Sequence, residues 1–270
     1  MSAMRFLRSR GRRVQSCEPQ ERQWEWWGDA NASVFVAGHS NRWAYRAAFD
    51  HGLASGVAVL VPKEPVDPSA PPPQPDRTYW RTACSAPGRV LAVVWSGNQQ
   101  NMHFMFEFDE PLRLHDSGEA GTVVPASMIS AFWEPSIAGM DVHVTSVRAE
   151  HLLVLGTPPP KTEEEIRAGL TREPKLLGVL AAAGESVDTI RITPTAVRVG
   201  LWKILQADYE ARAVRIGAVF VPVPASAQTA DGCLKPEYSV GDSSHANAAF
   251  GALMLGEIEA ALASAEVPQS

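Results

Sequence analysis

Short hydrophobic runs alternate with helical patterns along most of the chain. The runs that predict strands lie at residues 34–36, 57–61, 89–95, 152–155 and 218–221. The third run is continuous from Val90 to Val94, which is typical of a strand that is covered on both faces. Strands that alternate with helices in this way predict a parallel sheet with helices on both sides.

Apolar residues at helical spacing predict helices at residues 42–51, 127–133, 194–212 and 250–262. A further helix is predicted to begin after Thr162, because Glu165 follows three residues later in the arrangement of a capping box. These elements fit one α/β domain. A chain of 270 residues with 45% apolar content is long enough to bury the core of such a domain.

The chain divides into one domain, residues 32–264, and two flanking segments. Residues 1–31 form an extension that carries five arginines near its start and three tryptophans near its end, and residues 265–270 form a tail. We expect the tryptophans to pack as a flap over the sheet edge or the first helix, with a sugar-stacking surface as the alternative. Residues 99–149 are the longest insertion and are expected to lie over the site. Seven prolines in residues 62–75 predict an extended surface linker.

Composition and charge argue against several classes of partner and binding site. A net charge of −6 and a pI near 5.7 argue against nucleic acid as a partner. Three cysteines without paired spacing build neither a disulfide framework nor a zinc site. We find no apolar run that approaches the roughly 18 residues of a membrane span, and residues 1–17 lack the apolar core of a secretion signal. We therefore expect a cytoplasmic protein without a membrane span.

Candidate catalytic residues follow three of the predicted strands. Asp242 and His245 stand three residues apart at the entrance of the last helix, where a carboxylate can fix the tautomer of an imidazole. Ser40 follows the first strand and Asn98 follows the third. Because ligands of open α/β sheets bind beyond the carboxyl ends of the strands, these segments are predicted to converge on one edge.

The order of these motifs resembles that of the SGNH, or GDSL-like, hydrolases. Gly38-His39-Ser40 is similar to the first block of the family, with His39 where the family usually has Asp. Ser96-Gly97-Asn98-Gln99 is similar to the Gly-x-Asn-Asp block, and Asp242-Ser243-Ser244-His245 matches the terminal Asp-x-x-His. The family's glycine that donates an amide to the oxyanion has no clear counterpart between the first two blocks.

The resemblance implies a three-layer α/β/α, flavodoxin-like fold with a five-stranded parallel sheet. It implies that Ser40 is the nucleophile, that His245 is its general base and that Asp242 orients the imidazole. The backbone amide of Ser40 and the side chain of Asn98 would bind the oxyanion. No cofactor or metal is required. The residues expected to contact substrate are His39, Gly97 and His103.

We therefore predict a serine esterase that hydrolyses a small-molecule acyl ester, with an acetylated carbohydrate as one candidate substrate. Two alternatives stay open: a binding protein that kept this fold without the chemistry, and an acyltransferase that uses the same acyl-enzyme. An α/β-hydrolase is disfavoured, because Arg42 stands where its Gly-x-Ser-x-Gly elbow requires the second glycine.

Each motif also has a purely structural explanation. Ser40 or Asp242 could cap the helix that follows it, and Asn98 could shape a turn. A metal site that includes His39 and His103 is disfavoured, because their spacing matches no ligand motif. The structural explanations do not account for the shared position of the three motifs at strand ends.

Overall fold

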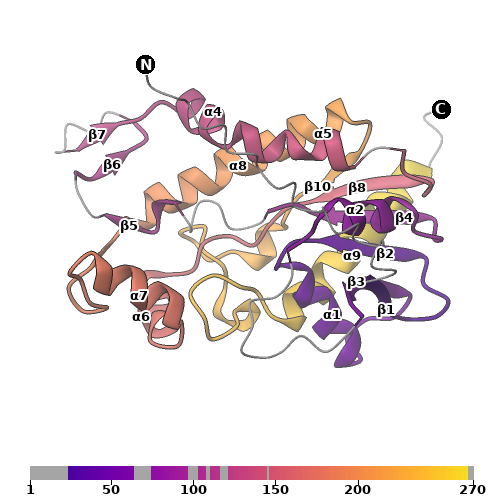
Figure 1. The fold of residues 1–270 in the computed structure, drawn as a ribbon, viewed down its shortest axis with the longest axis horizontal. Coiled ribbons are helices and arrows are strands. Elements are labelled where there is room, and N and C mark those ends of the chain that lie inside the picture. The colour runs from indigo at the N-terminus through magenta and orange to yellow at the C-terminus, as the bar shows by residue number, and fades with distance from the viewer. Residues whose placement is uncertain are drawn as a thin grey trace, which may run out of the picture.

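The computed structural model describes residues 24–63, 74–96, 103–107, 110–115, 121–144 and 146–266. Its centre is a six-stranded sheet with the order β1-β3-β2-β4-β8-β10 (Figure 1). The strands are β1 (Trp24–Gly28), β2 (Val34–Gly38), β3 (Val57–Pro62), β4 (Val90–Val94), β8 (His151–Leu155) and β10 (Val219–Val221). The five strands after β1 are mutually parallel. In chain order they stand 2-1-3-4-5, which is the flavodoxin-like order. The predicted fold class is therefore confirmed, with one antiparallel strand added.

The added strand is the tryptophan-rich segment, which forms the sheet edge instead of folding over it. Trp24 pairs with Pro62 and Trp27 pairs with Val59, so β1 runs antiparallel to β3. An edge strand leaves a row of unpaired N–H and C=O groups, and β1 satisfies those of β3. The side chains alternate, because Trp24 is buried and Trp27 is partly exposed beside Asp50. The expectation of a flap was wrong because aromatic residues fit a pleated strand well.

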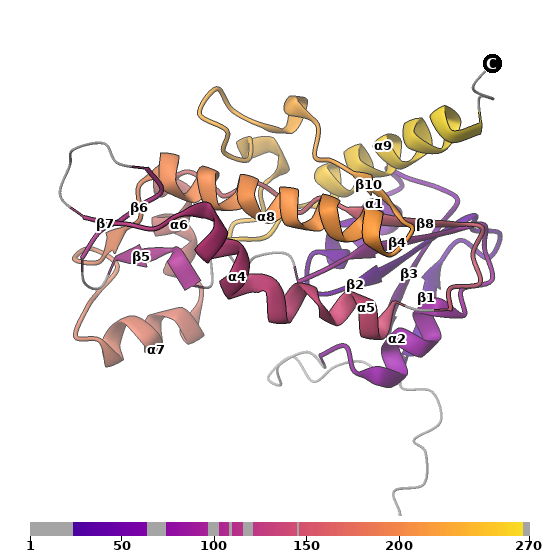
Figure 2. The ribbon, with the colours of Figure 1, turned by 90° about the horizontal axis from the view of Figure 1, so that it is seen from above.

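Helices cover both faces of the sheet (Figure 2). Helices α1 (Arg42–Asp50) and α9 (Ala248–Glu266) pack together on one face, with a core that includes Val36, Val59 and Phe250. The other face is covered by α2 (Arg77–Cys84), α4 (Ala126–Ile137), α5 (Gly139–His143) and α8 (Thr195–Arg215). Helices α6 (Glu163–Leu170) and α7 (Pro174–Ala182) lie beyond the ends of the strands. The layers are those of an α/β/α protein.

The predicted helices are present, and three more, including the short α5, were missed. The capping box of α6 is confirmed: Thr162 Oγ1 accepts a hydrogen bond from Glu165 N, and the Glu165 carboxylate accepts one from Thr162 N, both at 3.2 Å. Helix α2 was not predicted, although Asp76 caps it by accepting a hydrogen bond from Tyr79 N at 2.8 Å. Helix α7 was also missed. Most of the proline-rich linker, residues 64–73, lies outside the described residues.

The described part of the insertion at residues 99–149 contributes to the core. Helix α4 packs on α8, and Trp133 is only 1% exposed. Short strands complete the region: β5 (Phe106–Glu107) pairs with β9 (Arg191–Ile192), and β6 (Leu112–Arg113) pairs with β7 (Thr122–Val123). Trp133 thus supports the fold rather than offering a surface for ligands. Two 3-10 turns, η1 (Ala225–Ala227) and η2 (Pro236–Tyr238), precede α9.

Helix α9 is longer and more apolar than the sequence pattern suggested. By length and composition alone, its stretch Ala248–Ala265 meets the criteria of a membrane span, and 28% of that stretch is buried inside the protein. The expectation that no apolar run approaches this length was therefore wrong. Here α9 packs against α1 so closely that a Cβ on Gly251 would lie 2.2 Å from the carbonyl oxygen of Ala44. In this structure α9 serves as a helix of the core.

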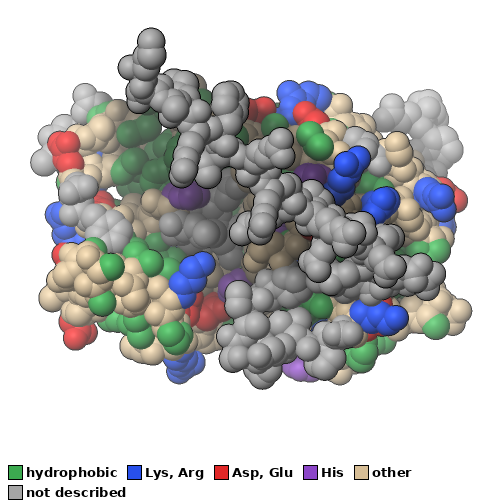
Figure 3. Space-filling model, in the orientation of Figure 1, with side chains coloured by type: hydrophobic (Ala, Val, Ile, Leu, Met, Phe, Trp, Pro, Cys, Tyr) green, Lys and Arg blue, Asp and Glu red, His purple; other side chains and the backbone are tan. Residues whose placement is uncertain are grey.

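Charged side chains are spread over the visible face in Figure 3, where Lys and Arg stand among acidic and hydrophobic groups. Several basic residues pair with acids, as Arg89 does with Glu150 and Arg167 with Glu163. The absence of a nucleic-acid partner stays a prediction.

Candidate active site

The nucleophile turn begins where β2 ends. Gly38 has a φ of +154°, and a Cβ at this position would lie 2.1 Å from the carbonyl oxygen of Val94 on the neighbouring strand. The His39 amide donates to that same oxygen at 3.0 Å, which fixes the chain at the sheet edge. Ser40 follows as an exposed residue just before α1. A glycine is therefore required here so that the serine can emerge at the end of the strand.

Two buried side chains hold the backbone of Gly38. Tyr79 Oη donates to the Gly38 carbonyl at 2.9 Å and accepts from its amide at 2.6 Å. Arg42 Nη1 donates to the same carbonyl at 2.6 Å. Burial raises the pKa of Tyr79 to about 12, although Arg42 and the hydrogen bond to Gly38 oppose this shift. Tyr79 thus keeps its proton, and the strand end beside Ser40 is held rigidly.

Asp242 and His245 form a short, directed pair. His245 Nδ1 lies 2.6 Å from Asp242 Oδ2. The second carboxylate oxygen, Oδ1, accepts from the backbone amides of His245 at 2.7 Å and Ser244 at 2.9 Å. Because Asp242 accepts the Nδ1 proton, the neutral ring keeps Nε2 as its free acceptor. This is the tautomer that a general base needs.

The environment keeps Asp242 ionised. Burial alone would raise its pKa, but the hydrogen bond and charge of His245 and the two backbone amides lower the pKa far below the ordinary value of an aspartate. Its side chain is 25% exposed and that of His245 is 37% exposed. The carboxylate can therefore stabilise a positive charge that develops on the imidazole.

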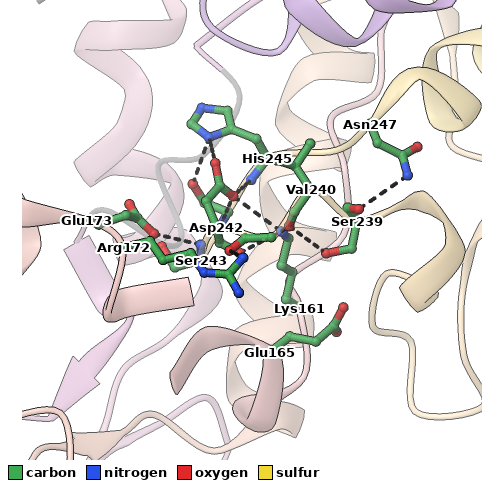
Figure 4. A network of polar contacts seen from close by, with 12 residues as sticks. Lys161, Glu165, Arg172, Glu173, Ser239, Val240, Asp242, Ser243, His245 and Asn247 are labelled. Atoms are coloured by element: carbon green, nitrogen blue, oxygen red, sulfur yellow. Dashed lines mark hydrogen bonds and ion pairs between the residues drawn. The ribbon is translucent and has the colours of Figure 1, made fainter. Parts of the chain in front are cut away.

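Lys161 supports this acid from the protein interior (Figure 4). Its side chain is fully buried, and Nζ donates to Asp242 O at 2.7 Å and to Val240 O at 2.5 Å. The same nitrogen lies 3.3 Å from Asp242 Oδ1. Burial lowers the pKa of Lys161, while Asp242 acts in the opposite direction. Arg198 Nη1 donates to the Lys161 carbonyl at 2.5 Å, which anchors the lysine to α8.

The turn between α6 and α7 holds the same loop through Arg172 and Glu173 (Figure 4). The Glu173 carboxylate accepts from the Ser243 amide at 2.6 Å, and Arg172 donates to the Gly241 carbonyl at 3.2 Å. A Cβ on Gly169 would lie 2.3 Å from the backbone of Asp242, so α6 can approach the loop only because it has a glycine there. The loop is thus fixed on several sides.

Ser40 and His245 line the same cavity, which has a volume of about 370 Å³. The structure therefore brings together three predicted catalytic residues, because Asp242 is bonded to His245. Among the described residues, Ser40 makes no hydrogen bond to the imidazole. Such contacts are often long before substrate binds. The shared cavity is the observation that joins the first and last motifs.

His39 and His103 lie in aromatic clusters and are not among the described residues that line this cavity. The His39 ring is 5.3 Å from Trp95 and 5.8 Å from Trp80, and its Nδ1 accepts a hydrogen bond from Ser96 N at 3.0 Å. Burial, followed by the charge of Arg42, lowers the pKa of His39 to about 4. The ring of His103 is 5.1 Å from that of Phe132. A substrate contact by either histidine stays a prediction.

The second predicted oxyanion donor cannot be placed. Gly97 and Asn98 lie outside the described residues, as do residues 64–73 of the proline-rich linker. Ser96 is described and has a φ of +45°, in the left-handed region that favours glycine. Ser96 stands at the position of the glycine in the Gly-x-Asn-Asp block. No group of metal-ligating side chains occurs within the parts of the chain that the structure describes.

Some residues of the site were not found from the sequence. Lys161 follows β8 at the same sheet edge as Ser40, so its strand-end position was the available signal. Tyr79 lies on α2, the helix that was missed, and no motif marks it. Asn41 precedes α1, and its side-chain amide is buried beside the cavity without a partner among the described residues.

Comparisons with known proteins locate structural relatives only. No family model and no curated protein sequence matches the chain. A GDSL-like lipase from Bacteroides thetaiotaomicron has 13% identity and a TM-score of 0.45, with 87% of this chain and 89% of that chain covered.

Two further solved structures have the same kind of similarity. A carbohydrate acetylesterase from Sinorhizobium meliloti has 15% identity and a TM-score of 0.40, over 87% of this chain and 99% of that one. The periplasmic domain of a Salmonella lipopolysaccharide acetyltransferase has 8% identity and a TM-score of 0.45, over 86% and 84%. The reaction has to be argued from this chain's own residues.

Proposed function

We propose that the protein is a serine hydrolase that cleaves small acyl esters through Ser40, His245 and Asp242. The observation that carries the proposal is the common cavity of Ser40 and His245, together with the 2.6 Å contact between His245 Nδ1 and Asp242 Oδ2. Helix capping alone would explain neither the contact nor the shared cavity. The triad is recognised by such geometry and not by its order in the sequence.

The reaction has two stages. Ser40 Oγ attacks the ester carbonyl carbon while His245 Nε2 takes its proton, and Asp242 stabilises the imidazolium. The C–O bond to the alcohol then breaks, and His245 returns the proton to the departing oxygen. In the second stage water attacks the acyl-enzyme with His245 again as the base, which releases the acid and restores Ser40. The backbone amide of Ser40 is one donor for the oxyanion, and Asn98 is proposed as another.

The rival from another class is a binding protein that has lost the chemistry. Two departures from the GDSL-like motifs motivate this alternative. His39 stands where the family usually has Asp, and the glycine that donates to the oxyanion has no clear counterpart. The glycine turn before Ser40 and the 2.6 Å contact between His245 Nδ1 and Asp242 Oδ2 support the enzyme. A transferase would use the same acyl-enzyme and differ only in the acceptor, so analysis of the products with added alcohols distinguishes it from a hydrolase.

The test is hydrolysis of p-nitrophenyl acetate, combined with labelling by a fluorophosphonate. We expect the wild type to turn over the ester and to gain one covalent adduct at Ser40, located by peptide mapping. Ser40→Ala should lose both turnover and labelling. Ser85 is an exposed serine at the end of α2, and Ser85→Ala should retain both. Turnover that survives Ser40→Ala would remove Ser40 from the role. A wild type that neither turns over nor becomes labelled would favour the binding protein.

A further inference from the structure

The cavity of Ser40 and His245 continues along α1 as a groove, which we call the α1 groove. Its remaining walls come from one side of α1 and from the segment that leads into α9. On α1 and just after it, the wall residues are Trp43, Ala44, Ala47 and His51. On the opposite side they are Val240, Ala246, Asn247 and Ala248. The groove thus begins at the proposed catalytic pair and leads away from it.

The walls of the α1 groove are mainly apolar and small. Three of its alanines are buried: Ala44 is 4% exposed, Ala246 is 6% exposed and Ala248 is 8% exposed. Two of the wall residues are polar, Asn247 and His51. His51 is exposed and lies just after α1, at the end of the groove away from Ser40. The polar atoms of Asn247 are already used. Its Nδ2 donates to Glu237 O at 2.8 Å and to Ser239 O at 3.2 Å, and its Oδ1 accepts from two amides at the start of α9. Between Ser40 and His51, a ligand in the groove therefore meets mainly hydrocarbon walls.

The end of the groove beside Ser40 differs, because Asn41, one of its lining residues, has a buried amide. Asn41 is 3% exposed, and neither its Oδ1 nor its Nδ2 has a partner within the described part of the protein. Buried polar groups nearly always have partners, so an unpaired amide next to a cavity indicates a ligand that supplies one. One polar end and a long apolar remainder match an ester group attached to an alkyl chain. The hydroxyl groups of a sugar would find no partners along the alanine walls.

We propose that the α1 groove binds the acyl chain of the substrate and that the enzyme prefers medium-chain acyl esters over acetyl esters. This inference rests on the proposed function, because it assigns the groove to the chain of the acyl group that Ser40 would attack. A volume of about 370 Å³ is at the small end of ligand pockets. It suits a single unbranched chain of about four to eight carbons. Each methylene that the groove buries raises kcat/KM by up to about fourfold.

The experiment measures kcat/KM for p-nitrophenyl acetate, butyrate, hexanoate and octanoate. Wild type is compared with Ala47→Phe, which fills the groove from a half-buried position on α1. Ala260→Phe, at an exposed position far along α9, is the matched control. We expect a rise with chain length in the wild type and the control. In Ala47→Phe we expect the octanoate value to fall at least about tenfold and the acetate value to fall less than about threefold.

Other outcomes overturn the inference. A flat chain-length profile in the wild type, or an equal loss for acetate and octanoate in Ala47→Phe, would contradict the acyl groove while the proposed function stands. If no ester is turned over, the proposed function fails. Calorimetry with sodium octanoate and sodium acetate then tests separately whether the α1 groove binds an acyl chain. The inference is supported if Ser40→Ala binds octanoate more tightly than acetate and if Ser40→Ala/Ala47→Phe no longer binds octanoate. Equal or undetectable binding of both acids would refute it.

Discussion

Lys161 binds the backbone and the carboxylate of the same residue, Asp242. Its buried ammonium group donates to Asp242 O at 2.7 Å and lies 3.3 Å from Asp242 Oδ1. Asp242 in turn holds the ring of His245 with its other oxygen. The proposed general base is therefore positioned through a chain that begins in the protein interior, so its orientation depends on a residue that never touches the substrate.

The first prediction concerns the removal of this cation. Lys161→Met keeps the length of the side chain but leaves two carbonyl oxygens and a carboxylate without their buried partner. We expect the free energy of unfolding to fall by roughly 3 kcal/mol, as when a buried ion pair loses one member. We also expect kcat to fall in the folded fraction, measured at a temperature where the variant is native by circular dichroism. Lys175→Met, at an exposed position on α7, should change neither quantity. A Lys161→Met protein with unchanged kcat would show that the lysine serves stability alone.

The second prediction concerns the tautomer of His245. In Asp242→Asn the amide can present an N–H to Nδ1, which favours the wrong tautomer for a general base. We expect kcat for p-nitrophenyl acetate to fall by about 10⁴-fold, with KM changed little. Steady-state kinetics on the purified variant provide the measurement, and Asp188→Asn, at an exposed site, is the control. A loss below about tenfold would mean that Asp242 does not orient the base.

The sequence predicted the sheet well because its signals are local. The run from Val90 to Val94 is apolar at every position, and it forms the buried strand β4. The edge strand β1 was not predicted, because whether Trp24 to Gly28 pairs with β3 or folds over it depends on partners that lie 30 to 38 residues further along the chain. Helix α2 was not predicted because it follows a proline-rich stretch that dominates the local pattern.

The site was predicted in part for the same reason. Asp242 and His245 are close in sequence, and Ser40 follows an evident strand, so strand-end placement located them. Lys161 and Tyr79 bind backbone atoms of segments that are distant in the sequence, and no local spacing encodes such contacts. The expected contact of His39 with substrate stays a prediction. Trp80 and Trp95 give its ring an aromatic environment that only the folded chain reveals.

The third prediction is a dependence of stability on pH through His39. Its folded-state pKa is lowered from 6.5 to about 4, so the unfolded chain binds a proton at a higher pH than the folded protein does. The contribution of His39 to the free energy of unfolding is therefore fully present above pH 6.5. It is lost as the pH drops from 6.5 towards 4, and the loss is on the order of 3 kcal/mol. Chemical denaturation at several pH values measures this. His39→Asn keeps an acceptor for the Ser96 amide but does not titrate, so its curve should be flatter across that range. An identical slope in both proteins would exclude His39 as the source.

The last prediction separates stability from activity at Asn41. The amide is buried without a partner among the described residues, and leucine has nearly the same size and shape. Asn41→Leu removes the cost of an unpaired buried polar group, so the free energy of unfolding should rise by about 1 to 3 kcal/mol. If the amide contacts the bound ester, kcat/KM should fall in the same variant, with hexanoate and acetate affected alike because the contact lies at the carbonyl end. Denaturation and kinetics on one preparation give both values. A variant that is more stable and equally active would show that Asn41 has no ligand, whereas a less stable variant would show that the amide has a partner inside the protein.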